Sequence, residues 1–426
     1  MSVAERDLKV IWHPYTQMKT MDLPVVITRG EGVWLYDEDG NKYLDAISSW
    51  WVNSHGHAHP HIAEKVAEQV HKLEHVIFAG FTHPGAVELA ERLVQKLPDN
   101  QKHIFYSDNG STAVEVALKM AIQYWDNRGE QRNVIIAFDN AYHGDTFGAM
   151  AVSGRGAFVR PFESMLFDVV FIEPPKEGKE ELSQTQLKNA IQEKGSQIAG
   201  FIYEPLIQGA AGMNMYSAKG LETLIQECQK NDVLCIADEV MTGFGRTGKF
   251  FASDHLAVNP DIVCMSKGIT GGTMALGATS CSVDIYNRFL SDDKSKTLFH
   301  GHSYTGNPIA CAAANASMDL FDEEGTWKNI KRICAQHKEF ASKLRDFNNV
   351  ENVRQVGTIV AFELKTGGET SYFNEDRDRI YNFFMDKKVL LRPLGNVIYI
   401  LPPLCITDEE LDQVYEVVLA FLADYR

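Results

Sequence analysis

Three short apolar runs, each ending in polar residues and glycine, constrain the fold of this chain most strongly. They are AGFIYEPLIQG (199–209), VLCIADEVMTGFG (233–245) and DIVCMSKGITGG (261–272). Near-continuous apolar runs of this length are typical of strands that are buried on both faces, as in a parallel sheet covered by helices. The sequence therefore predicts an α/β protein with a mostly parallel central sheet.

Segments of helical periodicity alternate with these runs, as an α/β fold requires. Residues 62–73 place apolar side chains at the spacing of one helix face. The run HIFYSDNGS (103–111) predicts a strand that ends in a glycine turn, and residues 112–125 predict the helix that follows. Thr112 and Glu115 stand at capping-box spacing, so we expect them to begin that helix.

The sequence pattern changes toward the C-terminus. From about residue 315 the helices become more charged, and residues 354–365 and 397–403 predict strands of a smaller α+β domain. A short meander is predicted over residues 30–49. The length of 426 residues suits a large domain with a smaller one beside it. We predict an N-terminal segment contributing to the small domain and to the active site, a large domain and a C-terminal small domain, over residues 1–55, 56–315 and 316–426.

The charge balance excludes several classes of partner. Lysine and arginine number 41 against 57 acidic residues, which gives a net charge of −16. A chain of this sign lacks the basic surface that binds nucleic acid or an anionic membrane. No apolar run approaches the roughly 20 residues of a membrane helix, and the charged N-terminal residues are unlike a signal peptide. Seven cysteines without a CxxC pair indicate reduced thiols, so we expect a cytoplasmic protein.

The polar ends of the predicted strands nominate one site. Functional residues of open α/β sheets lie beyond the carboxyl ends of the strands, where the parallel strands meet. The residues at these ends are Ser111, Tyr142, Glu204, Asp238 and Lys267.

Asp238 and Lys267 are informative as a pair. Taken separately, Asp238 can be interpreted as a helix cap or an ion-pair partner, and Lys267 can be interpreted as a structural lysine. A desolvated lysine between a buried strand and a glycine turn has a lowered pKa, which a Schiff-base lysine requires. An acid at the next strand end can hold a cationic ring nitrogen.

Gly110 and Ser111 open the predicted helix directly after a strand. Free backbone N–H groups and the helix dipole make such a position a phosphate site. Tyr142, at another strand end, can lie on an aromatic ring or can be an ordinary core tyrosine. A lysine, an acid, a phosphate site and an aromatic cover are what a pyridoxal phosphate site requires, so the four features together predict that cofactor.

Two further motifs have competing readings. GFGRTG (243–248) matches the dinucleotide fingerprint GxGxxG and would suit a nicotinamide oxidoreductase. No long helical pattern follows it, so we interpret it as a tight loop. HGHAHPH (55–61) suggests metal binding, but glycine and proline interrupt it and no acid or cysteine accompanies it. We interpret it as a loop before a helix and expect no metal.

Aromatic residues and one arginine outside the predicted sheet point to a substrate cleft. Trp50 and Trp51 are adjacent, so in an extended segment only one of them can point into the core. Tyr15 belongs to the same aromatic group. Arg392 precedes a proline, which biases it away from helix, and a loop arginine can bind a substrate carboxylate bidentately or form a surface ion pair.

Five longer segments of the chain resemble a known protein family. The segments YHGDTFGAM (142–150), EPLIQGAAGM (204–213), IADEVMTGFGRTGKFFA (236–252), SKGITGG (266–272) and HGHSYTGNPIACAAA (300–314) resemble the class III pyridoxal-phosphate aminotransferases. The resemblance runs through nearly the whole chain in consistent order. It implies the fold-type-I architecture, pyridoxal 5'-phosphate as cofactor and a homodimer with active sites at the subunit interface.

The resemblance also implies a role for each matching residue. Lys267 would carry the cofactor, Asp238 would pair with its ring nitrogen and Tyr142 would stack on its ring. Gly110 and Ser111 would bind the phosphate together with His302 and Ser303 of the partner subunit. The residues implied to meet the substrate are Tyr15, Trp51, Tyr142, Lys267, Gly301, Arg392 and Tyr399.

Three segments bear on the substrate. IWHPYTQM (11–18), SSWW (48–51) and LLRPLGNVIYILPP (390–403) resemble the biotin-pathway members of the family. This implies transfer of an amino group from S-adenosyl-L-methionine to 8-amino-7-oxononanoate, giving 7,8-diaminononanoate. HGHSY (300–304) replaces the HGPTF of many adenosylmethionine-using members, which leaves lysine open as the donor. Another class III ω-amino acid transaminase is the second alternative.

Overall fold

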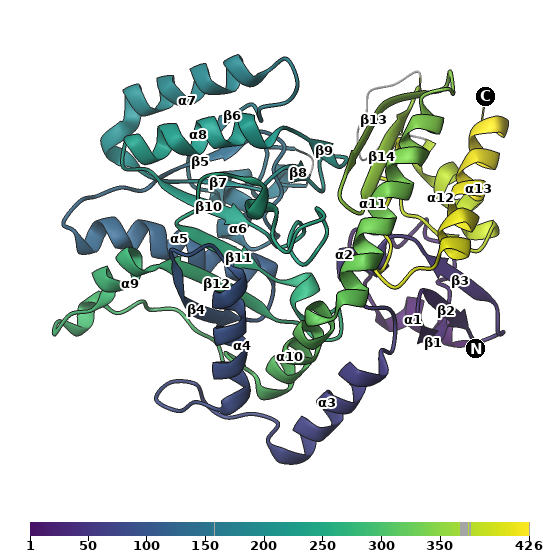
Figure 1. Ribbon diagram of the computed structural model, residues 1–426, viewed down its shortest axis with the longest axis horizontal. Helices are drawn as coiled ribbons and strands as arrows, with labels where there is room; N and C mark the ends of the chain where they lie inside the picture. The colour runs from purple at the N-terminus through teal and green to yellow at the C-terminus, as the bar shows by residue number, and fades with distance from the viewer. Residues whose placement is uncertain (157, 367–373, 375, 426) are drawn as a thin grey trace.

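The computed structural model describes residues 1–156, 158–366, 374 and 376–425. At its centre is a sheet with the strand order β4-β12-β11-β10-β7-β5-β6 (Figure 1). Neighbouring strands pair in parallel except at β12, which runs antiparallel to both β11 and β4. This mixed, mostly parallel sheet confirms the predicted α/β class. Its strands are β4 (Gln101–Ser107), β5 (Val134–Phe138), β6 (Val169–Ile172), β7 (Ile198–Tyr203), β10 (Leu234–Asp238), β11 (Ile262–Met265) and β12 (Gly277–Ser282).

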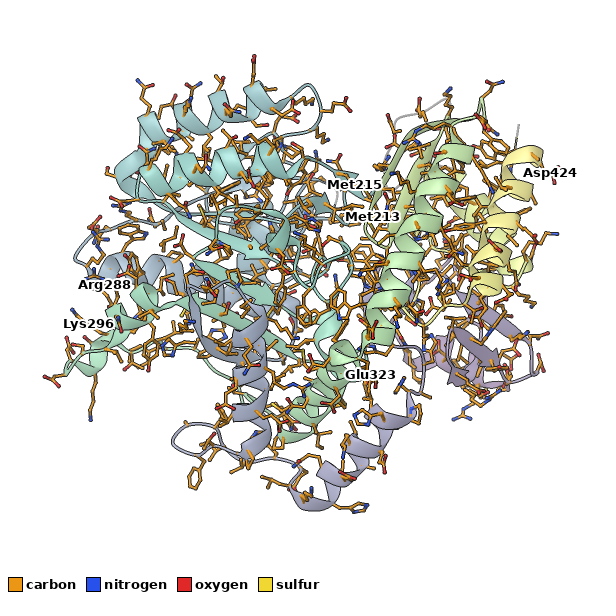
Figure 2. The ribbon with its side chains drawn as sticks, in the orientation of Figure 1. Met213, Met215, Arg288, Lys296, Glu323 and Asp424 are labelled. Carbon is orange, nitrogen blue, oxygen red and sulfur yellow. The ribbon has the colours of Figure 1, made fainter. Side chains whose placement is uncertain are left out.

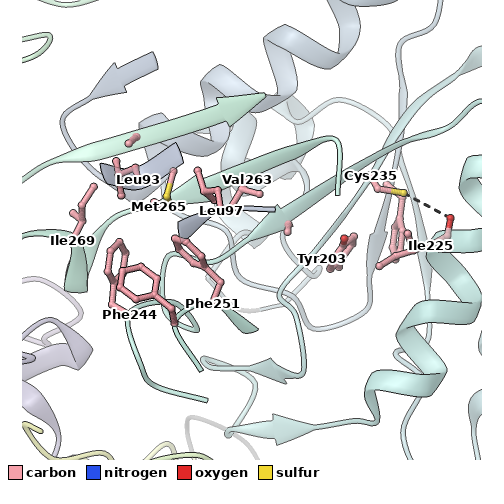
Figure 3. Packing of buried hydrophobic residues seen from close by; sticks show 14 of the residues in the cluster. Leu93, Leu97, Tyr203, Ile225, Cys235, Phe244, Phe251, Val263, Met265 and Ile269 are labelled. Carbon is pink, nitrogen blue, oxygen red and sulfur yellow. Dashed lines mark hydrogen bonds between the residues drawn. The ribbon is translucent and has the colours of Figure 1, made fainter. Parts of the chain in front are cut away.

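Helices cover both faces of this sheet. Because side chains alternate along a strand, Ile136 and Phe138 of β5 enter one apolar cluster while Ile135 and Ala137 enter another. The first cluster includes side chains of α4, α7 and α8, and Figure 3 shows part of it. The second includes side chains of α5, α6 and α9. These helices are α4 (Pro84–Lys96), α5 (Gly110–Asn127), α6 (Phe147–Ala151), α7 (Glu180–Lys194), α8 (Ala218–Lys230) and α9 (Val283–Phe289).

A smaller antiparallel sheet, β13-β14-β16, forms the second lobe on the right of Figure 1. Three C-terminal helices supply side chains to its apolar cluster. The elements of this lobe are β13 (Val350–Val356), β14 (Ile359–Leu364), β16 (Val397–Ile400), α11 (Glu324–Leu344), α12 (Asp376–Asp386) and α13 (Asp408–Asp424).

The N-terminal meander forms a third sheet, β1-β2-β3-β15. Its last strand comes from the C-terminal part of the chain, where Val389 pairs in parallel with Leu44. The purple N-terminal strands of Figure 1 therefore lie beside the yellow C-terminal helix. The domain limits 1–55, 56–315 and 316–426 stay a prediction. The strands are β1 (Ile27–Glu31), β2 (Trp34–Asp37), β3 (Lys42–Asp45) and β15 (Val389–Leu390).

A short hairpin, β8-β9, approaches β13 of the small lobe. Figure 2 shows Met213 and Met215 at this boundary. None of the helices in the described residues is long and apolar enough to span a membrane. The remaining elements are β8 (Ile207–Gln208), β9 (Asn214–Met215), α1 (Val3–Val10), α2 (Ser48–Trp51), α3 (Pro60–Lys72), α10 (Pro308–Asp322), and the 3-10 turns η1 (Arg160–Met165), η2 (Gly195–Gln197), η3 (Ala252–His255), η4 (Lys267–Thr270) and η5 (Lys294–Lys296).

Two local predictions were wrong in detail. Helix α5 begins two residues before Thr112, and its cap is Asn109, whose side chain accepts a hydrogen bond from the Thr112 N–H. Glu115 instead accepts hydrogen bonds from Thr146 and Gly148, so it binds the following loop rather than its own helix start. The predicted strand 354–365 is two antiparallel strands, because Gly357 has a φ of +54° and turns the chain between them.

Candidate active site

The carboxyl ends of five parallel strands meet at one edge of the central sheet and surround a cavity of about 440 Å³. This is the edge that the strand-end rule nominates. Five of the strand-end residues predicted from the sequence lie together there, although they are far apart in the chain. The cavity is lined by Ser111, Tyr142, Glu204, Asp238 and Lys267, and also by Trp51, Gly110, His143, Val240, Met241, Ser266 and Thr273.

Lys267 follows β11 and is half-buried in this cavity with a backbone φ of +49°. A non-glycine residue in this left-handed region is strained, which is typical of a functional position. Its ammonium lies 4.7 Å from the centroid of the Trp51 ring. Burial lowers the pKa of Lys267 to about 8, although the Asp238 and Glu204 carboxylates act in the opposite direction. The amine is therefore available in its neutral, nucleophilic form near physiological pH.

Asp238 ends β10 and is almost fully buried. Its Oδ2 lies 2.6 Å from Nδ1 of His143, and its Oδ1 accepts a hydrogen bond from the Val240 N–H at 3.0 Å. Both oxygens are thus fixed in orientation, and the carboxylate faces the cavity that Lys267 lines. A fixed, buried carboxylate of this kind favours a cation beside it.

Glu204 follows β7 and is buried near Asp238. Its carboxylate accepts hydrogen bonds from the N–H groups of Tyr142 and Gly209. Burial raises the pKa of Glu204 to about 7, with the Asp238 charge adding to the shift and His143 opposing it. Glu204 therefore joins the loops after β5 and β7 at the floor of the cavity.

The N-terminus of α5 forms a third wall of the cavity. Gly110 and Ser111 are its first residues, and their backbone N–H groups precede the helical hydrogen-bond pattern. Glycine is required twice here. A Cβ on Gly110 would lie 2.7 Å from Val240 Cγ1, and one on Gly144 would lie 2.1 Å from Ser111 Oγ. The close approach of these loops leaves an anion-binding helix end open to the cavity.

Aromatic side chains cover the remaining sides. The hydroxyl of Tyr15 donates to Asp145 Oδ2 at 2.6 Å and lies 3.3 Å from the Tyr142 hydroxyl. The indole N–H of Trp51 donates to the Tyr399 hydroxyl at 3.0 Å. The N-terminal segment and the small lobe therefore both contribute aromatic walls to a site whose polar groups come from the large lobe.

Comparison with known proteins decides the family. The chain matches the family described as "Aminotransferase class-III" over residues 15–422. The chain belongs to the class III aminotransferases. Among its relatives, the adenosylmethionine-8-amino-7-oxononanoate aminotransferase of Synechococcus elongatus is 44% identical over 97% of this chain and 98% of that protein.

Solved structures agree with this assignment. The enzyme of the same name from Methanocaldococcus jannaschii is 39% identical, with a TM-score of 0.92 over 98% of each chain. A PLP-bound amine transaminase from an uncultivated Pseudomonas species is 32% identical, with a TM-score of 0.91 over 97% of this chain and 98% of that one. The fold-type-I architecture expected from the sequence is therefore confirmed.

The residues predicted for this aminotransferase fall into three groups. One group lines the cavity: Trp51, Gly110, Ser111, Tyr142, Asp238 and Lys267. A second group contacts these residues or a sequence neighbour of one of them. Tyr15 contacts Tyr142, Tyr399 contacts Trp51, and the Arg392 guanidinium lies 5.0 Å from the ring centroid of the neighbouring Trp50. The third group is absent from the cavity lining: Gly301, His302 and Ser303.

His143 and Asp145 were absent from the predicted site of the aminotransferase. His143 is buried against Asp238, and Asp145 accepts the Tyr15 hydrogen bond. Both stand beside Tyr142 in the run YHGD (142–145), so the strand-end signal that selected Tyr142 covered them as well. The strand-end pattern does not predict where each side chain points, because consecutive residues of a loop point to different partners.

The two alternative motifs have structural roles. In GFGRTG, the fully buried Arg246 donates to the carbonyl groups of Pro402 and Asn53, so the loop ties the lobes of the aminotransferase together. The element after the loop is the short turn η3, in place of the long helix that a dinucleotide fingerprint needs. The histidine-rich segment contacts separate partners, with His57 on Asp45 and His61 on Asp319.

Proposed function

We propose that this chain is a pyridoxal-phosphate-dependent aminotransferase that converts 8-amino-7-oxononanoate to 7,8-diaminononanoate. The observation that carries the proposal is the convergence of Lys267, Asp238 and the N-terminus of α5 on one cavity. These groups fit the cofactor. Asp238 is a fixed anion for the ring nitrogen, the open N–H groups at Gly110 and Ser111 suit a phosphate, and the Lys267 amine is buried and of lowered pKa.

The chain's own residues supply the steps around this cofactor. When bound, pyridoxal phosphate supplies an aldehyde for the amine and a ring that withdraws electrons from the reacting carbon. Asp238, oriented by His143, keeps the ring nitrogen protonated. Lys267 Nζ would act as general base and then general acid in each half of the reaction. In the first half it would move the proton from the donor α-carbon to the aldehyde carbon of the cofactor, and in the second half it would move a proton from that carbon to the former keto carbon of the acceptor. Tyr142 covers the ring and shields the site from water.

The substrate assignment follows from the walls of the site and from the relatives' names. Tyr15, Trp51 and Tyr142 provide apolar faces for the methylene chain of a long acceptor. We propose that Arg392, beside Trp50, binds the carboxylate of that acceptor bidentately. Tyr399 fixes Trp51 and completes this wall. The named relatives act with adenosylmethionine, which we propose as the donor here.

We also propose a homodimer in the cytoplasm with active sites at the subunit interface. The loop before α10 holds Gly301, His302 and Ser303, which are not among the residues that line the cavity. In a symmetric dimer this loop can enter the neighbouring site. His302 and Ser303 of the partner subunit then complete the phosphate site, and Gly301 of the partner subunit borders the substrate.

An assay of the purified protein with pyridoxal phosphate tests the proposal. The acceptor is 8-amino-7-oxononanoate, and S-adenosyl-L-methionine and lysine are supplied as separate donors. We expect 7,8-diaminononanoate with adenosylmethionine. Formation of product with lysine alone would identify lysine as the donor, and the HGHSY loop (300–304) would then account for that preference. Transfer to other ω-amino or keto acceptors but never to 8-amino-7-oxononanoate would contradict the substrate assignment and leave the cofactor chemistry intact.

A further inference from the structure

The turn that presents Trp51 to the cavity has a strained backbone. Ser48, Ser49 and Trp51 have φ values of +53°, +60° and +66°. Serine and tryptophan rarely adopt this left-handed region, and a succession of such residues persists only when surrounding contacts enforce it. The sequence around this turn must therefore contain the groups that impose its conformation.

The Trp51 ring is closely packed against its neighbours. Its N–H donates to Tyr399, and its face lies 4.7 Å from Lys267 Nζ. A Cβ on Gly209 would approach a ring carbon of Trp51 to 3.2 Å, so the ring lies almost on the backbone at that point. A shift of the turn moves the ring either into Lys267 or out of the substrate cavity.

Asp45 supplies the contacts that enforce the turn. It is fully buried, and its Oδ1 accepts the Ile47 N–H at 3.1 Å. Its Oδ2 accepts the Ser49 N–H at 2.7 Å and the Ser49 hydroxyl at 3.0 Å. The same oxygen lies 2.9 Å from Nε2 of His57. One carboxylate thus accepts two backbone N–H groups and one hydroxyl group of the turn.

His57 fixes that carboxylate to the rest of the molecule. Its Nδ1 accepts from the Asn53 amide at 3.1 Å, which leaves the proton on Nε2 to point at Asp45. The Asn53 amide is itself oriented, because its Oδ1 accepts the Gly56 N–H. The backbone of His57 exchanges two hydrogen bonds with Gly32. The histidine is therefore a fixed donor with its ring in one orientation.

We propose that Asp45 and His57 are positioning residues that together set Trp51 against Lys267 and so define the wall of the substrate cavity. Neither residue of the pair lines the cavity, and the pair acts through the 47–51 turn. The catalytic meaning of the pair rests on the proposed function, whereas its effect on the place of Trp51 does not.

The first test observes Trp51 directly. The chain has six tryptophans, so protein labelled with 5-fluorotryptophan gives a small set of ¹⁹F resonances, and Trp51→Phe identifies the one from Trp51. His57→Leu removes the donor to Asp45, and His57→Gln keeps an N–H donor on a side chain of similar reach. His61→Leu is the matched control, because it removes another histidine–carboxylate pair from the same segment.

We expect His57→Leu to shift the Trp51 resonance, His57→Gln to restore most of its position, and His61→Leu to leave it unchanged. An unchanged Trp51 resonance in folded His57→Leu protein overturns the proposal, and so does an equal shift in His61→Leu. The readout needs no turnover. If the wild-type protein transfers no amino group while the resonance shifts as expected, the proposed function fails and the positioning role stands.

The second test is a double-mutant cycle in the amino-transfer assay. His57→Leu is expected to raise KM for the long acceptor and to lower kcat/KM by about tenfold, within the roughly hundredfold that a misplaced catalytic group can cost. In a Trp51→Phe background the same change should have little further effect, because both act on one wall. Fully additive effects in an active enzyme would contradict action through Trp51.

Discussion

Lys267 is subject to opposing electrostatic effects. Burial lowers its pKa from the ordinary 10.5 to about 8, while Asp238 and Glu204 favour the charged form. In the unfolded chain the pKa returns to its ordinary value. Below about pH 8 the ammonium is charged in both states, so folding carries the full cost of burying it. Above about 10.5 the amine is neutral in both states and that cost disappears.

The replacement Lys267→Met should therefore stabilise the cofactor-free protein. We expect a gain on the order of 3 kcal/mol below pH 8, from the size of the pKa shift, and a gain that shrinks between about pH 8 and pH 10.5. Chemical denaturation of both proteins across this pH range measures it. Lys328→Met, at a well-exposed lysine, is the control and should show no such pH dependence. A constant gain at all pH values would contradict the buried-ammonium account.

At the residue scale, the sequence predicts which residues belong to the site better than it predicts which groups those residues contact. Asp238 and Lys267 could be selected because each polar residue ends an apolar strand and is out of place there. His143 gives no such signal, since a histidine in a loop is unremarkable until the loop after β5 brings it to 2.6 Å from Asp238. The local turn that aims its ring depends on Ser153, which accepts the His143 N–H.

Helix α5 links fold stability to the phosphate site. Asn109 accepts the Thr112 N–H and caps the helix, while the N–H groups of Gly110 and Ser111 remain open to the cavity. Capping residues fix the entry of the chain into a helix and hence the direction of its free N–H groups. The cap of this helix should therefore matter for ligand binding as well as for stability.

Asn109→Ala is expected to destabilise the protein by about 1 kcal/mol and to weaken pyridoxal phosphate binding. Ser217→Ala is the matched control, because Ser217 caps α8 in the same way and lies outside the cavity lining. Denaturation and a cofactor-binding titration on each variant measure the two effects. Equal loss of cofactor affinity in both variants would show that the cap acts only through stability.

The wrong prediction of the α5 start has a physical reason. Thr112 and Glu115 do have capping-box spacing, but Glu115 accepts hydrogen bonds from Thr146, which precedes α6, and from Gly148 and Ala149 in the first turn of α6. A tertiary contact thus removed the partner that the local pattern requires. Local spacing predicted that a helix follows β4, and only the packing of the next loop decided its first residue.

The assembly is the property of the whole molecule that matters most for the site. Gly301, His302 and Ser303 are absent from the cavity lining of their own subunit, as the homodimer proposal requires. The loop between η5 and α10 also exposes large aromatic side chains, among them Phe299 and Tyr304. Phe299 and Tyr304 flank the segment of Gly301, His302 and Ser303, so these exposed rings belong to the surface that the proposed subunit interface would cover.

Subunit complementation tests this arrangement. Lys267→Ala should abolish turnover, and Ser303→Glu should weaken phosphate binding by placing a negative charge at its site in the neighbouring subunit. Random mixing of the two variants gives hybrid dimers with one intact site, so we expect about a quarter of the wild-type activity to return. Mixing the variants after unfolding and refolding, with each variant alone as control, provides the measurement. No recovery in verified hybrids would place Ser303 within its own subunit's site.

The overall arrangement could be predicted only in part. The central sheet follows from the apolar runs of 199–209, 233–245 and 261–272, because such runs require burial on both faces. The parallel pairing of Val389 with Leu44 could not be read from either segment. This pairing joins residues separated by most of the chain. A strand as short as β15, with two residues, has too little sequence pattern to predict which strand it pairs with.

The proposed chemistry depends on Lys267 as the lysine that carries the cofactor. The protein loaded with pyridoxal phosphate is reduced with borohydride, digested and mapped by mass spectrometry, and Lys267→Ala is treated in the same way. We expect the reduced cofactor on the peptide that contains Lys267, and no labelled peptide from Lys267→Ala. Label on another lysine, or equal labelling of the two proteins, would contradict it.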